Sequence, residues 1–182
     1  MAVSKTALLE GVKMNFDSIT TEMANNARRI QSLIEGVSVE QARWKPDPDT
    51  WSVMEVLNHL YDEERYDFRV RLDVILHHPD QPWPPIDPAG WVVERGYNQR
   101  ELAESLDGFL RERAESLEWL KGLSAPDWEA VYQAPFGPIT AGAVFASWAA
   151  HDLLHTRQLV ELHWAYVGRL LEPYGVDYAG SW

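Results

Sequence analysis

Two histidines that could bind a metal ion stand four residues apart in the stretch Ala150-His151-Asp152-Leu153-Leu154-His155. On a helix, residues at this spacing lie one turn apart on the same face. That face is otherwise mostly apolar, which predicts that both imidazoles point into the protein interior; its other members are Val144, Trp148, Gln158 and Leu162. Each neutral ring can offer one nitrogen to a metal ion, and the alternative is a pair of core histidines bonded to neighbouring groups.

A third inward histidine is predicted on an earlier helix. Ser52 and Glu55 have the spacing of a capping box, so a helix is expected to run from Val53 to about His77. His59 lies on an apolar stripe of this helix. Three histidine ligands with one open position are typical of a catalytic metal site. Imidazole suits zinc, nickel and iron alike, so the sequence does not select among these divalent ions.

Two charged residues also fall on apolar stripes, where an unpaired charge is costly. Glu63 follows His59 by one turn, and it needs a metal, an arginine or an imidazole as a partner unless it lies at the mouth of a wet cleft. Arg113 interrupts the stripe of a helix over about 98–121, so it must meet a carboxylate or an anionic ligand unless it reaches an edge. We predict that Arg113 pairs with an inward carboxylate, with Glu63 as the first candidate, and both are candidate catalytic residues.

Four amphipathic segments without strand signals predict an all-α fold, an antiparallel up-down four-helix bundle. The helices are expected over 5–35, 53–77, 98–121 and 140–167, with Asn98 and Thr140 as caps of the last two. We expect the bundle to span 1–167 and a C-terminal tail to span 168–182. Residues 126–138 are expected to form a loop. The long proline- and tryptophan-rich loop over 79–97 joins helices 2 and 3, and we expect it to cover the end of the bundle that holds the metal.

Composition narrows the function classes. The 182 residues carry a net charge of -12, so the basic footprint of a nucleic-acid-binding surface is missing. Cysteine is absent, which excludes disulfides and thiolate ligands. There is no apolar run of membrane-spanning length and no secretory signal, so we expect a cytoplasmic protein that does not bind membranes.

Several motifs resemble the DinB/YfiT-like metal-binding bundles in order and spacing, over about residues 8–166. The matching stretches are Trp44-Lys45-Pro46, Trp51-Ser52, Glu55-Val56-Leu57-Asn58-His59-Leu60, Tyr97, Phe109 to Arg113, Phe136-Gly137-Pro138-Ile139-Thr140 and Ala150 to His155. The resemblance implies that His59, His151 and His155 bind one divalent metal. Similar proteins include S-transferases and isomerases that use bacillithiol, mycothiol or glutathione.

Two classes of function remain open at this point. The first is an enzyme whose metal activates a thiol or water; a thiol-dependent S-transferase is favoured over a hydrolase, with a low-molecular-weight thiol as co-substrate. In that enzyme Glu63 would support the metal site or act as a general base, and Arg113 would hold an anionic part of a small-molecule substrate. The second is a non-catalytic bundle that binds a metal or ligand. A homodimer is an open alternative to a monomer.

Overall fold

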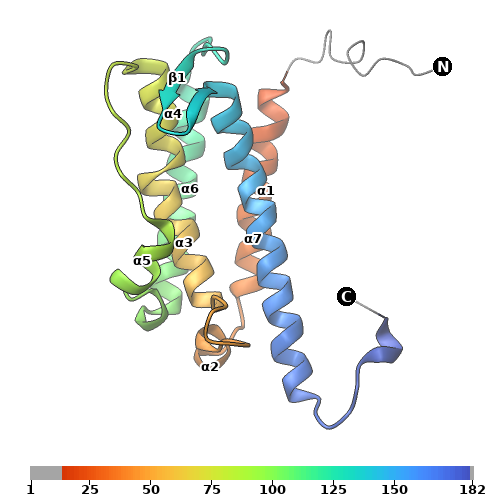
Figure 1. Ribbon diagram of the computed structural model, residues 1–182. Helices are drawn as coiled ribbons and strands as arrows, with labels where there is room; N and C mark the ends of the chain where they lie inside the picture. Colours follow the sequence, from red (N-terminus) through yellow and green to blue (C-terminus); the bar gives the residue numbers. More distant parts are fainter. Residues whose placement is uncertain (1–13, 181–182) are drawn as a thin grey trace, which may run out of the picture.

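Four long helical segments form the protein, which we describe from a computed structural model over residues 14–180 (Figure 1). They are α1 (Phe16–Ile34), α3 (Val53–Tyr66) continued by α4 (Phe68–His77), α6 (Leu102–Gly122) and α7 (Ala141–Leu170). The all-α four-helix class is confirmed. The part of the predicted first helix before residue 14 lies outside the described residues.

Short elements connect the long helices. They are α2 (Val39–Arg43), α5 (Pro88–Glu94), a single 3-10 turn (Tyr97–Gln99), and an antiparallel hairpin of β1 (Val131–Ala134) and β2 (Gly137–Thr140), while a further 3-10 turn (Asp177–Ala179) follows α7. The prediction of a plain loop over 126–138 was therefore wrong. The hairpin turn is possible because Gly137 adopts a left-handed backbone with φ of 122°, a conformation that favours glycine.

Helix starts follow the capping signals in two cases of three. Ser52 and Glu55 form a complete capping box at α3, with bonds of 2.8 and 3.1 Å, and Thr140 caps α7 by accepting from Ala143 N. Asn98 does not cap α6. It accepts from Ser52 Oγ at 2.8 Å and donates to the Arg43 carbonyl at 3.2 Å, so it joins two loops instead.

The predicted helix over 53–77 is interrupted at Asp67, whose φ of -117° and ψ of -92° are not helical. The hydrogen bonds around the break persist, because Asp67 N donates to Glu63 O and Arg71 N donates to Asp67 O. The long segment is therefore divided into α3, which ends at Tyr66, and α4, which begins at Phe68. No proline or glycine marks this position, so the sequence pattern could not reveal it.

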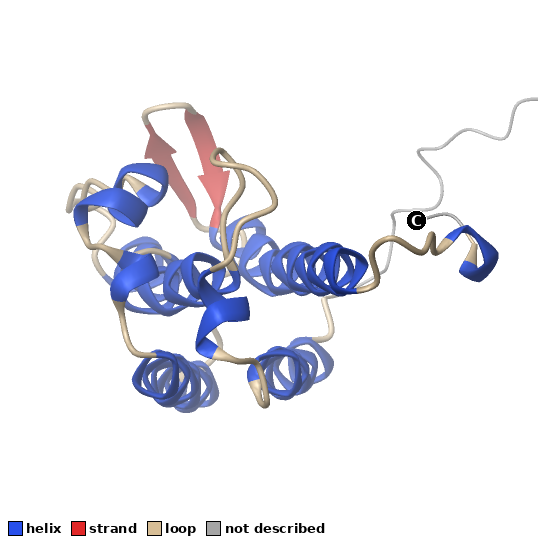
Figure 2. Ribbon diagram, turned by 90° about the horizontal axis from the view of Figure 1, so that it is seen from below, coloured by secondary structure: helices blue, strands red, loops and turns tan. Residues whose placement is uncertain are grey.

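The order of helix directions differs from the predicted up-down bundle. Contacts between α3 and α6 advance together along both helices, from Arg100 with Asn58 to Arg113 with Glu64, so these two neighbours are parallel. Neighbours α1 and α7 are also parallel, while α3 runs antiparallel to α7 (Figure 1). Seen along the bundle axis, α1 lies diagonally opposite α3, and α6 lies diagonally opposite α7 (Figure 2).

The reason for this order is the long connection between α4 and α6, which returns the chain to the end where α3 began. It is not irregular throughout, as predicted, because it contains α5. Its anchor is the buried carboxylate of Asp62, which accepts from Arg95 at 2.5 Å and from the Tyr97 hydroxyl at 2.6 Å. It runs along the flank of the bundle (Figure 1), so the prediction that it covers one end was wrong, and a role as a lid over the metal stays a prediction.

A polar layer crosses the middle of the bundle and separates two apolar clusters. One cluster includes Ile30, Leu57, Phe109, Leu159 and Leu162, and the other includes Met23, Leu72, Leu120, Phe145 and Trp148. Between them each long helix contributes buried polar side chains at the same height: Asn26, Glu63, Glu64, Arg113 and Asp152. The three candidate ligands belong to this layer. Within residues 14–180, none of the helices combines the length and apolar character needed to cross a membrane.

Candidate metal centre

Three imidazoles meet between α3 and α7. The Nε2 atom of His151 lies 3.3 Å from Nε2 of His59 and 3.0 Å from Nε2 of His155. The antiparallel packing of α3 against α7 sets this arrangement, because it brings the middle of one helix against the middle of the other. The sequence pattern had identified all three residues as inward, and the structure brings their rings together.

The donor set fits a divalent cation. A tetrahedral zinc site with Zn–N bonds of about 2.0–2.1 Å places neighbouring nitrogens roughly 3.3 Å apart. The Nδ1 atom of His155 lies 2.8 Å from Gln158 Oε1, which can only accept, so we assign the proton to Nδ1. That assignment leaves Nε2 of His155 with a free lone pair directed at the other two rings. A cation at this point would satisfy three converging lone pairs that otherwise face one another.

Glu63 lies behind the ring of His59. Its Oε1 atom is 3.8 Å from Nδ1 of His59, is buried and has no hydrogen-bond partner among the described residues. Burial and a hydrogen bond to Asp67 raise the pKa of Glu63 to about 9. Because Nδ1 is on the side of the ring away from the Nε2 cluster, this carboxyl group is placed to orient His59. A metal-bound histidine commonly donates its second N–H to such a group.

Aromatic rings surround the three histidines. The centroid of the Trp51 ring lies 4.9 Å from that of His59, and 6.4 Å from that of His155, with which it is stacked. The ring centroids of Phe68 and His151 are 5.1 Å apart. These contacts were not predicted as part of the site. Trp51 could have been found from its position directly before the capping box that starts α3, whereas Phe68 follows the unpredicted break at Asp67.

The enclosure keeps the imidazoles neutral, the form that binds metals. Burial, assisted by neighbouring imidazoles, lowers the pKa of His59 to about 3 and the pKa of His151 to about 2. Burial also lowers the pKa of His155, with an opposing contribution from its bond to Gln158. At neutral pH the three rings are therefore available as ligands.

Arg113 occupies the polar layer and pairs with inward carboxylates, but Glu63, the first candidate, is not one of them. Its guanidinium binds both oxygens of Asp152 at 2.7 Å and Glu64 Oε1 at 2.6 Å, and it also donates to the Met23 carbonyl at 3.1 Å. Only 2% of Arg113 is exposed. Its general pairing with buried carboxylates was anticipated, but the structure gives it a role in holding α1, α3, α6 and α7 together and does not favour substrate binding.

The residue that faces Arg113 was misassigned because Glu63 and Glu64 are adjacent and both are buried. On a helix they point about 100° apart, and Glu64 shares the direction of Leu57 and Leu60 toward the core. Asp152 was also missed, although it follows Trp148 by one turn. The indole N–H of Trp148 donates to Glu64 Oε1 at 2.6 Å, which completes the layer.

Comparison with known proteins supports the assignment of the fold as a four-helix bundle. The family model described as the DinB superfamily matches residues 22–159. A solved structure, described as "YfiT from Bacillus subtilis is a probable metal-dependent hydrolase with an unusual four-helix bundle topology", superposes with a TM-score of 0.75 at 16% identity. The similarity covers 91% of each chain, and at this identity it establishes the fold alone. None of the curated proteins matches the chain.

Proposed function

This chain belongs to the DinB superfamily, and we propose that it is a divalent-metal-dependent enzyme whose ion is held by His59, His151 and His155. The observation that carries the proposal is the convergence of three Nε2 atoms, with separations of 3.0 and 3.3 Å. Three protein ligands leave room for a fourth, exchangeable ligand, which distinguishes catalytic from structural sites.

The surrounding residues prepare the site for chemistry. Gln158 fixes the ring of His155 in the form that exposes Nε2, and Glu63 is placed to do the same for His59. Trp51 and Phe68 exclude water from the faces of the rings, which strengthens electrostatic interactions in the site. When bound, a divalent ion lowers the pKa of a neighbouring thiol or water.

We favour a thiol as the group that is activated. The ligands are neutral, so they leave the double charge of the ion uncompensated, and this charge favours an anionic partner. A free thiol has a pKa of about 8.5, whereas water starts from about 15.7, so a thiol needs the smaller shift. In the resulting transfer, sulfur forms a bond to an electrophilic carbon of the second substrate, the leaving group departs with the bonding electrons, and the thiol proton passes to water.

Hydrolysis is the second candidate, and the specific observation in its favour is the description of YfiT as a probable metal-dependent hydrolase. The same three histidines would then hold an ion that activates water in place of a thiol. The two reactions differ in their first substrate and can therefore be separated by a binding experiment.

The test is to titrate the cobalt-substituted protein with bacillithiol, mycothiol, glutathione and simple thiols while recording its absorption spectrum. We expect a thiolate-to-cobalt charge-transfer band with at least one of them. The band should be lost in His151→Ala and kept in His77→Ala, since His77 is exposed and lies outside the cluster. If the loaded protein gives no band with any thiol, the transferase assignment is wrong and hydrolysis becomes the favoured reaction.

A further inference from the structure

One arginine near the candidate metal centre carries hydrogen-bond donors that the fold does not use. Arg71 on α4 forms an ion pair with Asp67 through Nε, and its guanidinium lies over the ring of Trp83 at 4.5 Å from the ring centroid. Its terminal nitrogens, Nη1 and Nη2, make no hydrogen bond and no ion pair among residues 14–180. Because a guanidinium has N–H donors on all its nitrogens, those on Nη1 and Nη2 are free to bind a ligand.

The free donors of Arg71 contrast with those of Arg69 on the same helix. Nη2 of Arg69 donates to Glu112 at 2.9 Å, and its Nη1 donates to the Ser116 hydroxyl at 3.5 Å. The two arginine side chains are covered to a similar degree, with 18% of Arg71 and 21% of Arg69 exposed. Of the nitrogens of Arg71, only Nε is both buried and without a hydrogen bond, so Nη1 and Nη2 lie where a ligand can reach them.

Arg71 is the last member of a row of side chains that begins at the metal centre. Nδ1 of His59 lies 3.8 Å from Glu63. Glu63 is hydrogen-bonded to Asp67, which in turn pairs with Arg71. The guanidinium therefore contacts a residue two helical turns beyond His59. At about 1.5 Å per residue, this places it on the order of 10–15 Å from the point where the three Nε2 atoms meet.

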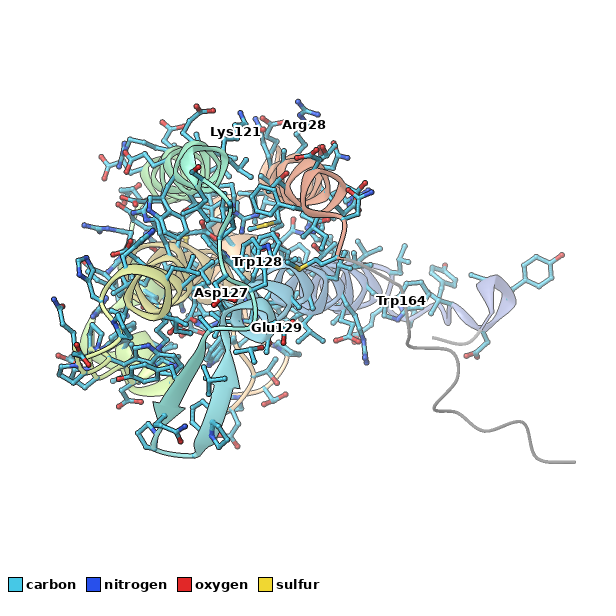
Figure 3. The ribbon with its side chains drawn as sticks, turned by 90° about the horizontal axis from the view of Figure 1, so that it is seen from above. Arg28, Lys121, Asp127, Trp128, Glu129 and Trp164 are labelled. Carbon is cyan, nitrogen blue, oxygen red and sulfur yellow. The ribbon has the colours of Figure 1, made fainter. Side chains whose placement is uncertain are left out.

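Trp83 and the hairpin hold this guanidinium in place. The Trp83 ring lies between Arg71 and the ring of Tyr132 on β1, whose centroid is 4.5 Å away, and Trp83 N donates to the Tyr132 hydroxyl at 2.9 Å. Figure 3 looks onto this end of the bundle and shows the hairpin on the side of α4 and α7 that is turned away from α1 and α6, with Trp128 in the segment that leads into it. A stacked, planar guanidinium loses little freedom when it binds.

The geometry and charge of Arg71 favour a carboxylate as the ligand. The two terminal nitrogens form a planar fork that matches both oxygens of a carboxylate. A single negative charge also suits the surroundings, because Asp67 is adjacent and the chain carries a net charge of -12. Both repel a group with two negative charges, such as a phosphate, more strongly.

We propose that Arg71 binds a carboxylate at the far end of the substrate while the reacting end occupies the metal position. This subsite rests on the proposed function, since it takes the three histidines as the place of reaction. It restricts the substrate to elongated molecules whose carboxylate lies on the order of 10–15 Å from the atom that binds the metal. It also provides the anion-binding group that Arg113, held by Glu64 and Asp152, does not provide.

The test uses hydroxamates, which bind a metal ion with open positions whether the reaction involves a thiol or water. Each hydroxamate carries a methylene chain that ends in a carboxylate or, in its neutral counterpart, in an amide. Chains of about two to ten methylene groups cover the distance to Arg71. Dissociation constants are taken from the absorption spectrum of the cobalt-substituted protein. We expect short carboxylates to bind like the amides, and carboxylates long enough to reach Arg71 to bind at least about tenfold more tightly.

Three variants identify the residue that binds the carboxylate. Arg71→Met should remove the advantage of the long carboxylates, whereas the matched control Arg69→Met should keep it. Arg71→Lys should keep only part of it, because lysine retains the charge but lacks the planar fork. Circular dichroism and cobalt content establish that each variant is folded and loaded. The comparison of carboxylates with amides in the wild type decides the proposal even if Arg71→Met does not fold.

Each other result has a defined meaning. Equal dissociation constants for carboxylates and amides at every chain length overturn the subsite and leave the proposed function intact. An advantage that survives in Arg71→Met, or that disappears in Arg69→Met, overturns the assignment to Arg71. A cobalt spectrum that no hydroxamate changes shows that the ion has no open position, and this result overturns the proposed function together with the subsite.

Discussion

Replacing Arg113 by methionine removes the guanidinium that faces two buried carboxylates, Glu64 and Asp152. Both carboxylates are about as inaccessible as Arg113, at 2% and 1% exposure, and water cannot replace the lost partner. Breaking a buried ion pair costs about 3–5 kcal/mol. Because two carboxylates lose their common cation, we expect the free energy of unfolding to fall by the upper part of this range.

The assay is urea unfolding of metal-free protein, which keeps metal binding out of the comparison. Arg157→Met is the matched control. Arg157 binds Glu161 at 2.7 Å, a distance like those made by Arg113, but its side chain is 76% exposed. An exposed pair contributes about 0–1 kcal/mol, so the control should change stability little.

A double-mutant cycle identifies the partner. Arg113→Met and Glu64→Gln should show a coupling energy of a few kcal/mol, whereas Arg113→Met and Glu63→Gln should be nearly additive. The loss of stability in Arg113→Met should also be smaller at low pH. Burial raises the pKa of Asp152, and the variant lacks the guanidinium of Arg113, which lowers it in the wild type. A folded state that retains protons gains stability as pH falls. Equal effects of Arg113→Met and Arg157→Met would refute the reasoning.

Three further outcomes are expected. His151→Ala should lose most of the bound metal in elemental analysis of untagged protein, and full stoichiometry in this variant would show that the site is wrong. Glu63→Gln should weaken metal binding by about 10–100-fold, and an unchanged dissociation constant would remove its role in orienting His59. Relative to His59→Gln, metal-free wild type should lose stability as pH falls below about 6.5, by up to about 1.4 kcal/mol per pH unit, because unfolded His59 takes up a proton there whereas burial lowers the pKa of folded His59 to about 3. The comparison with the variant cancels the opposite contribution of Glu63, whose pKa burial raises to about 9; a difference in urea midpoint that is the same at about pH 7.5 and pH 5 would contradict this.

The helical periodicity of the sequence was sufficient to predict the class of fold and the inward direction of the three histidines. Each of these depends on a local pattern, such as the one-turn spacing of His151 and His155 on an apolar stripe. The capping box at Ser52 and Glu55 was equally local and equally reliable.

The predictions that were wrong concern how segments far apart in the sequence are placed relative to one another. The directions of α6 and α7 depend on the path of the connection after His77, and this path is fixed by tertiary bonds such as Asp62 with Arg95 and Tyr97. The choice between Glu63 and Glu64 as the partner of Arg113 depends on the rotation of α3 about its axis. Periodicity leaves that rotation uncertain by about one residue when both candidates lie near an apolar stripe.

The diagonal placement of consecutive helices has a consequence for how the protein folds. In an up-down bundle, each helix finds its neighbour through a short turn, so local hairpins form early. Here α1 packs mainly on α6 and α7, and α3 also packs on α6 and α7, so the principal contacts join residues far apart along the chain. Folding rates fall as contacts become less local. We therefore expect slower and more cooperative folding than in an up-down bundle of equal size, with no stable half-molecule and with the three histidines assembled only when both halves of the chain have met.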